Sequence, residues 1–213
     1  MKKKVIFRSG SLRMGGLERI LIEVLQNIDK KKYEIILVID DDCGKENIFE
    51  KDIPKDIKYY FLKPEKLIRK TEYHKLNKKK IYHKLMYNFY MFLENKTILK
   101  NMKKLMNDLK NIDVIIDFDA GASKYIEKLD INKKIVWIHN SIPKLKKKKS
   151  KIKRFGKRLE KYDKIVAICD DMKNELQNLY PNIKNKITRI YNPFNFKRIS
   201  ELSINAQELS LEQ

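Results

Sequence analysis

The sequence of 213 residues is strongly basic, with 49 lysines and arginines against 28 acidic residues and a formal net charge of +21. Hydrophobic residues make up 42% of it, enough for a sizeable core in one large domain or two small ones. Two cysteines exclude a disulfide framework or a cysteine-rich metal site and fit a reducing compartment. The first apolar run ends at Phe7, too short for a signal peptide, and no later run is long enough to span a bilayer. We therefore expect a cytoplasmic protein, either free or bound peripherally to a membrane.

The first predicted elements are a short apolar strand at residues 4–8 and an amphipathic helix at residues 15–28. Apolar residues recur along this helix at steps of three and four positions, so one of its faces is expected to be buried. Gly15 and Gly16 lie in the turn between the strand and the helix. Because a helix N-terminus has unpaired backbone N–H groups, and glycine lets a ligand approach them, this turn predicts a phosphate-binding loop.

The rest of the chain alternates between apolar runs and helical patterns. Further strands are predicted at residues 33–39, 57–62, 112–118, 134–138, 163–168 and 186–191. Helices are predicted between neighbouring strands at residues 122–129, 152–161 and 170–179. This alternation is typical of an α/β protein, and it predicts a Rossmann-like, doubly wound and mainly parallel sheet of about seven strands.

A long polar and aromatic stretch at residues 64–110 interrupts this alternation. We expect it to form a helical insertion of two helices with separate apolar faces. One face would contain Ile81, Leu85, Met86, Phe89 and Phe92, and the other Leu99, Met102, Leu105, Met106 and Leu109. The predicted organisation is one domain over residues 1–193, closed by the Asn192-Pro193 turn, with residues 194–213 as a linker or tail.

Basic residues gather in two segments that carry no acidic residue, at positions 144–158 and 75–84. Such segments are attracted to anionic lipid headgroups, so an anionic membrane surface is an expected partner. Apolar residues available to enter the interface are Leu145, Ile152, Phe155, Tyr82 and Met86. Lysine far outnumbers arginine, and asparagine and isoleucine are abundant, which is also the composition expected from an A- and T-rich genome. Nucleic acid is not an expected partner, because no helix-turn-helix, zinc-finger or RNA-recognition signature accompanies the charge.

Four motifs occur in a characteristic order along the chain. They are the loop Gly15-Gly16-Leu17-Glu18-Arg19, the run from Trp137 to Ser141, the apolar strand that ends near Cys169, and the turn Asn192-Pro193. In this order they resemble the N-terminal half of the family 4 glycosyltransferases, which adopt the GT-B fold. The loop is close to the family's Gly-Gly-Ala-Glu-Arg, and the Asn-Pro turn closes the first domain in those enzymes. The resemblance extends from residue 1 to about residue 199.

The resemblance implies retaining transfer of a sugar from a nucleotide diphosphate sugar to a glycan or lipid-linked acceptor, in surface polysaccharide synthesis. Gly15, Gly16 and Arg19 would then lie beside the donor pyrophosphate, and His139 would be the catalytic residue near the transferred sugar. The acceptor cleft would be lined by Asp119, Asn140 and Ser141. No essential metal or other cofactor is expected, because N–H groups at a helix N-terminus can stabilise the charge of a departing diphosphate.

The sequence departs from the family in its length. The family's enzymes are about twice as long, and their second Rossmann-like domain binds the nucleotide sugar through a basic pair and a pair of glutamates separated by seven residues. Here Glu201 and Glu208 are separated by six residues within a polar segment. We therefore expect this chain to be inactive alone, and to be a fragment, the product of an interrupted gene, or a subunit that needs a separate donor-binding partner.

Each candidate residue also has an interpretation without a ligand. Gly15 and Gly16 would form only a tight turn, and His139 would be a hydrogen-bonded residue of the sheet. Arg19 would pair with acidic residues on the helix surface. Asn140 and Ser141 would cap the turn that follows them.

Three other functions remain open. A nicotinamide-dependent enzyme would hold the ribose with Asp40, Asp41 or Asp42, although the glycines do not form G-x-G-x-x-G. A metal-dependent GT-A glycosyltransferase would use Asp117-Phe118-Asp119 as a D-x-D motif, although this pattern is common by chance and its carboxylates also suit capping of Gly121. A non-catalytic basic module would bind an anionic membrane or a lipid-linked glycan without transferring a sugar.

Overall fold

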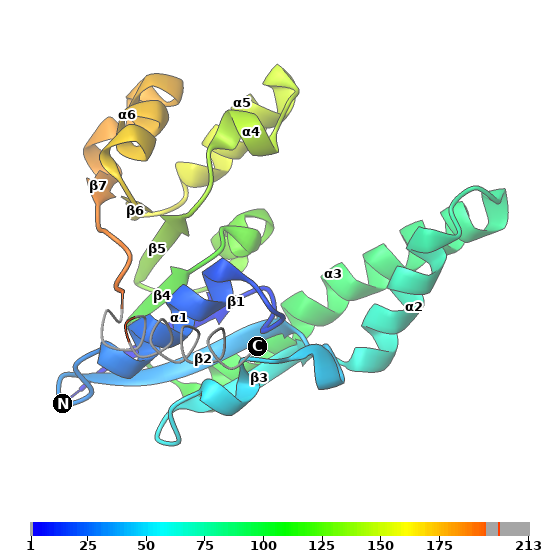
Figure 1. Cartoon of the computed structure of the whole chain (residues 1–213), viewed down its shortest axis with the longest axis horizontal. Helices are drawn as coiled ribbons and strands as arrows, with labels where there is room; N and C mark the ends of the chain where they lie inside the picture. Colours follow the sequence, from blue (N-terminus) through cyan, green and yellow to red (C-terminus); the bar gives the residue numbers. More distant parts are fainter. Residues whose placement is uncertain (1, 195–199, 201–213) are drawn as a thin grey trace, which may run out of the picture.

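The computed structural model describes residues 2–194 and residue 200. In this part of the chain seven strands form one sheet in which every neighbouring pair is parallel (Figure 1). They are β1 (Lys3–Ser9), β2 (Tyr33–Asp41), β3 (Lys58–Lys63), β4 (Val114–Asp117), β5 (Lys133–Ile138), β6 (Lys164–Ala167) and β7 (Ile187–Arg189). The predicted Rossmann-like parallel sheet is confirmed. Most of the predicted tail, residues 194–213, lies outside the described residues.

The order of the strands reverses at β1. The sheet runs β3-β2-β1-β4-β5-β6-β7, so β2 and β3 lie on one side of β1 and the strands from β4 onward lie on the other. In open α/β sheets ligands bind beyond the carboxyl ends of the strands at such a switch point. The register places Arg8 of β1 opposite Asp117 of β4 at that end.

Helices cover the two faces of the sheet. Helix α1 (Gly16–Asn27) packs Leu21, Ile22 and Leu25 against one face, in agreement with the predicted apolar stripe. On the other face lie α3 (Ile81–Leu109), α5 (Lys149–Leu159) and α6 (Asp170–Leu179). A short helix, α4 (Ile142–Leu145), connects β5 to α5.

The insertion at residues 64–110 forms a hairpin of α2 (Glu65–Leu76) and α3 that extends away from the sheet (Figure 1). Two helices are confirmed, but their predicted division is wrong. Both predicted apolar faces belong to the single helix α3, because residues 93–98 contain no glycine or proline that would end it. Only the second face packs against the sheet, whereas Ile81, Leu85 and Phe89 of the first are exposed.

Two further expectations need correction. The helix predicted at residues 122–129 is instead a pair of short 3-10 helices, η3 (Gly121–Lys124) and η4 (Ile126–Lys128), because Tyr125 between them has a non-helical backbone. Phe155, expected to enter a membrane interface, is buried in the core, and Ile152 is packed against it. The apolar side of α5 therefore faces the sheet, and its lysines face outward. No helix in the described residues is both long and apolar enough to cross a bilayer.

Candidate active site at the carboxyl end of the sheet

A buried arginine organises the carboxyl end of the sheet. Arg8 is only 2% exposed, and its guanidinium bonds to carboxylates at the carboxyl ends of the two neighbouring strands. Nε donates to Oδ1 of Asp40 over 3.0 Å, and Nη1 donates to Oδ1 of Asp117 over 3.0 Å. Asp119 also accepts a hydrogen bond from Nη1. Sequence reasoning missed this cluster, although an arginine inside an apolar strand, with acidic residues ending its predicted neighbours, was a visible signal.

The cluster bears on two of the alternative functions. Asp40, one of the three aspartates that a nicotinamide enzyme could use for the ribose, is paired with Arg8. Asp117 and Asp119, the carboxylates of the D-x-D motif, are paired with the same guanidinium. Asp117 also accepts a hydrogen bond from the hydroxyl of Tyr162 over 2.5 Å, and burial raises its pKa to about 6. The Asp117 carboxylate is thus committed to a guanidinium and a phenol.

Two glycines allow the cluster to pack closely. A Cβ atom on Gly10 would lie 2.6 Å from Oδ2 of Asp119, and one on Gly121 would lie 2.7 Å from Cζ of Arg8. The Gly121 amide donates to Oδ1 of Asp119 over 2.8 Å, as the capping interpretation of that carboxylate predicted. Asp119 is therefore held in one position from both sides.

A cavity of about 80 Å³ lies next to this cluster, beyond β4 and β5. Its lining includes His139, Asp119 and Asn140, three of the predicted site residues, together with Leu17 from the first turn of α1. The structure thus brings the start of α1 and the ends of two middle strands to one place. The volume is enough for several water-sized groups.

Ser141 has a structural role beside this cavity rather than a place in its lining. Its hydroxyl donates to Oε2 of Glu175 in α6 over 2.6 Å. The other oxygen of the same carboxylate accepts the Ile142 amide at the start of α4 over 2.9 Å. Glu175 therefore caps α4, and the Ser141 hydroxyl is committed to this contact.

Two ring nitrogens at the cavity have no hydrogen-bond partner among the described residues. They are Nε2 of His139 and Nε1 of Trp137, and both atoms are buried. The two rings are stacked with their centroids 5.9 Å apart, and Phe118 lies against the imidazole. A buried polar atom without a partner costs about 1–3 kcal/mol, so these nitrogens indicate a site for a polar ligand.

His139 is neutral at neutral pH. Burial lowers its pKa to about 4, although the Phe118 backbone and the Asp119 carboxylate favour the charged form. A neutral imidazole donates from one nitrogen and accepts at the other. Its unpartnered nitrogen, Nε2, is therefore available for a hydrogen bond with a polar group in the cavity.

The glycine loop leaves room for a ligand on one side. Gly15 is the N-cap of α1 and has an extended backbone that any residue can adopt. No heavy atom lies within 4 Å of the position that a Cβ on Gly16 would take. A Cβ on Gly15 would collide with the carboxylate of Glu18, which also accepts a hydrogen bond from Ser11 over 3.3 Å. The free approach to the helix N-terminus is thus at Gly16.

Arg19 does not point toward this loop. Its guanidinium donates to Oε1 of Glu23 over 2.5 Å and to Oδ2 of Asp52 over 3.4 Å. These contacts match the surface pairing that was the alternative interpretation of Arg19. The structure does not bring Arg19 together with the other predicted site residues.

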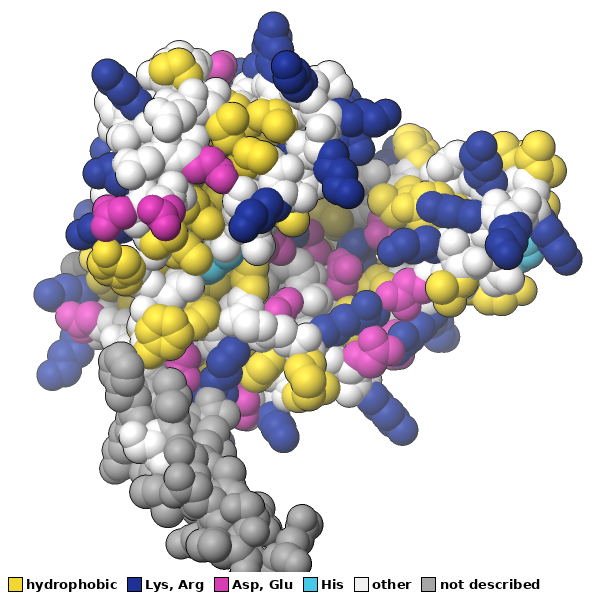
Figure 2. All heavy atoms as spheres, turned by 45° about the horizontal axis from the view of Figure 1, so that its top comes forward, with side chains coloured by type: hydrophobic (Ala, Val, Ile, Leu, Met, Phe, Trp, Pro, Cys, Tyr) yellow, Lys and Arg dark blue, Asp and Glu magenta, His cyan; other side chains and the backbone are white. Residues whose placement is uncertain are grey.

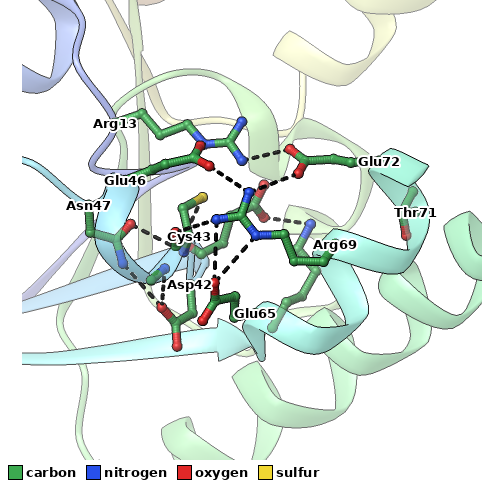
Figure 3. Close-up of polar contacts among 12 residues, drawn as sticks. Arg13, Asp42, Cys43, Glu46, Asn47, Glu65, Arg69, Thr71 and Glu72 are labelled. Carbon is green, nitrogen blue, oxygen red and sulfur yellow. Dashed lines mark hydrogen bonds and ion pairs between the residues drawn. The ribbon is translucent and has the colours of Figure 1, made fainter. Parts of the chain in front are cut away.

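Another arginine, Arg13, fixes the loop to the hairpin, and sequence reasoning missed it. Its Nη2 lies 2.6 Å from Oε1 of Glu72 in α2, and its Nε lies 3.0 Å from Oε2 of Glu46 (Figure 3). Arg69 of α2 pairs with the same two glutamates and with Glu65. The loop before Gly15 is thereby anchored to the insertion.

Comparisons with known proteins identify the family and the fold of the chain. The model of Glycosyltransferase Family 4 matches residues 14–198. HepE from Anabaena, in complex with UDP and glucose, has a TM-score of 0.60 and 13% identity over 98% of this chain and 50% of that one. A glycosyltransferase from Rickettsia africae has a TM-score of 0.55 and 16% identity over 91% of this chain and 44% of that one.

The N-terminal domain of trehalose-6-phosphate phosphatase from Candida albicans has a TM-score of 0.59 and 12% identity over 100% of this chain and 55% of that one. At such identities the similarity establishes the fold, which is that of one half of a GT-B glycosyltransferase. The chain spans about half the length of these structures. No curated protein matches it. Because the family model covers most of the sequence, the chain belongs to glycosyltransferase family 4.

Proposed function

We propose that this chain is the acceptor-side domain of a retaining glycosyltransferase. It would help to transfer a sugar from a nucleotide diphosphate sugar to a glycan or lipid-linked acceptor, in surface polysaccharide synthesis. The observation that carries this proposal is the pair of unpartnered ring nitrogens, on His139 and Trp137, at the cavity beyond the switch point of the sheet. Family membership and the UDP and glucose in HepE support it.

The residues around the cavity would orient the reacting sugar. Neutral His139 hydrogen-bonds a sugar hydroxyl through Nε2, and the Trp137 indole donates to another oxygen. Asp119 accepts a further hydroxyl, because Arg8 and the Gly121 amide hold its carboxylate at the cavity. Hydrogen bonds fixed in this way before the reaction lower its barrier without reorganisation in the transition state.

The N-terminus of α1 would stabilise the leaving group. As the glycosidic bond to the diphosphate breaks, negative charge develops on the phosphate oxygens, and the first-turn amides near Gly16 are free to approach them. Arg19 is left out of this role, since it pairs with Glu23 and Asp52. The stabilisation comes from backbone groups, so the proposal requires no metal and no other cofactor.

The nucleotide would be held elsewhere. The chain covers about half of the solved structures that it resembles, so we propose that a separate domain or subunit binds the nucleotide and that the chain alone is inactive. We place the enzyme on the cytoplasmic side of an anionic membrane. Free thiols on Cys43 and Cys169, without a disulfide among the described residues, are compatible with that compartment.

The only tryptophan of the chain gives a direct test of the site. Because Trp137 lines the cavity, its indole N–H produces a single NMR signal that reports on it. With the donor-binding part added unlabelled, we expect this signal of the labelled chain to shift in a saturable way with at least one of UDP-glucose, UDP-galactose, UDP-N-acetylglucosamine and GDP-mannose, and much less with UDP or GDP. An indole signal that none of these sugars moves at millimolar concentration would contradict a sugar at this cavity.

A further inference from the structure

The α2–α3 hairpin projects beyond the carboxyl ends of the strands, which is also the end of the sheet where the cavity lies. Helix α3 has 29 residues, and it passes the carboxyl end of β3 at Glu94, whose Oε2 lies 2.7 Å from Nζ of Lys63. Both of these side chains are buried. Residues 81–93 extend past this ion pair by about 20 Å. The first half of α3 thus lies outside the core, where α3 packs against α2.

The outer part of the hairpin exposes large apolar side chains. We call residues 73–92 the hairpin tip; it contains the end of α2, the turn and the first half of α3. Leu76 is 84% exposed and Ile81 is 78% exposed, on either side of the turn. Five more exposed members are Tyr73, Tyr82, Leu85, Phe89 and Phe92. Figure 2 shows these hydrophobic side chains together with basic ones on the arm at the right.

The charge of the hairpin tip has one sign. The tip contains five lysines and no aspartate or glutamate: Lys75, Lys78, Lys79, Lys80 and Lys84. Nζ of Lys78 lies 3.3 Å from the centre of the Tyr87 ring, so part of the charge is carried directly over the aromatic surface. Exposed aliphatic and aromatic side chains surrounded by lysines are typical of helices that lie in the headgroup region of a membrane.

We propose that the hairpin tip inserts its apolar side chains into the interface of an anionic lipid bilayer, while its lysines contact the headgroups. Charge complementarity favours this occupant, because a surface with five cations and no acidic group requires a negative partner. A second copy of this chain, with a net charge of +21, would bring more positive charge to the same surface. Helix α5 contributes basic charge to membrane binding, but its Phe155 is buried and does not enter the bilayer.

Docking through the hairpin tip would also position the cavity. The hairpin leaves the sheet at the same carboxyl end of the strands that holds His139 and Gly16. Arg13 connects the glycine loop to α2 through its ion pair with Glu72. A lipid-linked acceptor in the same bilayer would then meet that edge. This orientation rests on the proposed function, whereas the membrane binding itself does not.

Sedimentation of the 213-residue chain with vesicles tests the binding. We expect it to bind phosphatidylglycerol–phosphatidylcholine vesicles at low salt, and pure phosphatidylcholine vesicles much more weakly. The triple variant Ile81→Gln, Leu85→Gln and Phe89→Gln should weaken partitioning more than 10-fold, because it removes the inserted groups. These side chains are exposed, so the melting temperature should stay unchanged.

A matched pair of charge variants separates the effect of the hairpin tip on vesicle binding from the effect of the net charge of the chain. Lys75→Gln, Lys79→Gln and Lys80→Gln should weaken partitioning about 100-fold, since each lysine near an anionic surface contributes about fivefold. The control variant, Lys100→Gln, Lys103→Gln and Lys104→Gln, removes the same charge from the other half of α3, where these lysines are also exposed. It should weaken partitioning less than about threefold. Equal losses in the two variants would overturn the proposal.

A reporter within the tip tests insertion directly. In a Tyr82→Trp variant that also carries Trp137→Phe, the added indole is the only one. We expect its emission to shift to the blue on anionic vesicles, and brominated lipid chains to quench it. Absence of binding to anionic vesicles, an unshifted emission from this indole, or unchanged binding of the apolar triple variant would each contradict the proposal.

Two further outcomes separate this proposal from its alternatives. A change of oligomeric state in the apolar triple variant would show that another copy of the chain covers the tip instead. His139→Ala should bind vesicles normally, so failure of the proposed function would remain distinguishable from failure of membrane binding.

Discussion

Nη1 of Arg8 lies 3.0 Å from Oδ1 of Asp117 on the neighbouring strand, and both side chains are buried. The same guanidinium also pairs with Asp40 and Asp119, so one buried cation holds three carboxylates at the carboxyl end of the sheet. The position of Asp119 at the cavity therefore depends on this arginine.

Replacing Arg8 with methionine should destabilise the protein by about 3–5 kcal/mol, because it leaves buried carboxylates without their cation. Arg8→Lys should restore only part of this loss, since an ammonium cannot reach three carboxylates with the geometry of a guanidinium. Urea unfolding measures both effects. An Arg8→Met variant as stable as the wild type would show that the cluster contributes nothing to the fold.

The glycines near the site should respond differently to alanine. Gly16→Ala should leave the stability nearly unchanged, because nothing lies within 4 Å of the added Cβ, but it should weaken binding of the donor diphosphate. Gly121→Ala should destabilise the fold by about 1–3 kcal/mol, because its Cβ would overlap the guanidinium of Arg8. Thermal melts and donor KM values of the two variants check this contrast, and equal effects on KM would count against Gly16 as the point of approach.

His139 should make stability depend on pH. Its pKa is lowered to about 4 in the folded protein, whereas the unfolded chain takes up a proton near the ordinary value of 6.5. The stability that neutral His139 contributes is therefore present above pH 6.5 and is lost as the pH falls toward 4. The difference between the free energies of unfolding of the wild type and of His139→Gln should therefore change over this window, because only the wild type loses stability as the pH falls from 6.5 toward 4. A constant difference from pH 7.5 to pH 4 would mean that the imidazole titrates normally.

Glu72 should affect the position of the glycine loop, and hence donor binding, more than it affects the free energy of unfolding. It pairs with both Arg13 and Arg69 at a partly exposed position, where such ion pairs contribute about 0–1 kcal/mol. Glu72→Ala should raise the donor KM through loss of the Arg13 contact. Glu65→Ala is the matched control, because Glu65 pairs with Arg69 alone. A similar KM in both variants would exclude a positioning role for Arg13.

Much of the fold was predictable because its signals are local. Runs of β-branched residues identify the buried strands, and the spacing of Leu21 and Leu25 identifies the buried side of α1. The division of the insertion was not predictable in this way, because exposed Phe89 and buried Met102 have the same periodicity within one helix. Whether an apolar face is covered depends on residues distant in the sequence.

The candidate site was predictable only in part, for a related reason. His139, Asp119 and Asn140 meet at one cavity because the ends of parallel strands lie at one edge. The pairing of Arg8 with three aspartates depends on contacts between residues more than 30 positions apart, so local patterns could not reveal it. Ser141 and Arg19 look like ligands in the motif, but Glu175 and Glu23 bind their side chains.

The most direct test of the account is the transfer rate of the His139→Ala variant, in an enzyme that contains residues 1–213 together with its donor-binding part. His83→Ala, a histidine of the hairpin tip outside the cavity, is the control. Loss of a hydrogen bond made to the reacting sugar should lower kcat/KM by about 10- to 100-fold in His139→Ala, with the fold intact. The account is contradicted if His139→Ala transfers sugar as fast as the wild type, or if both histidine variants lose the same activity.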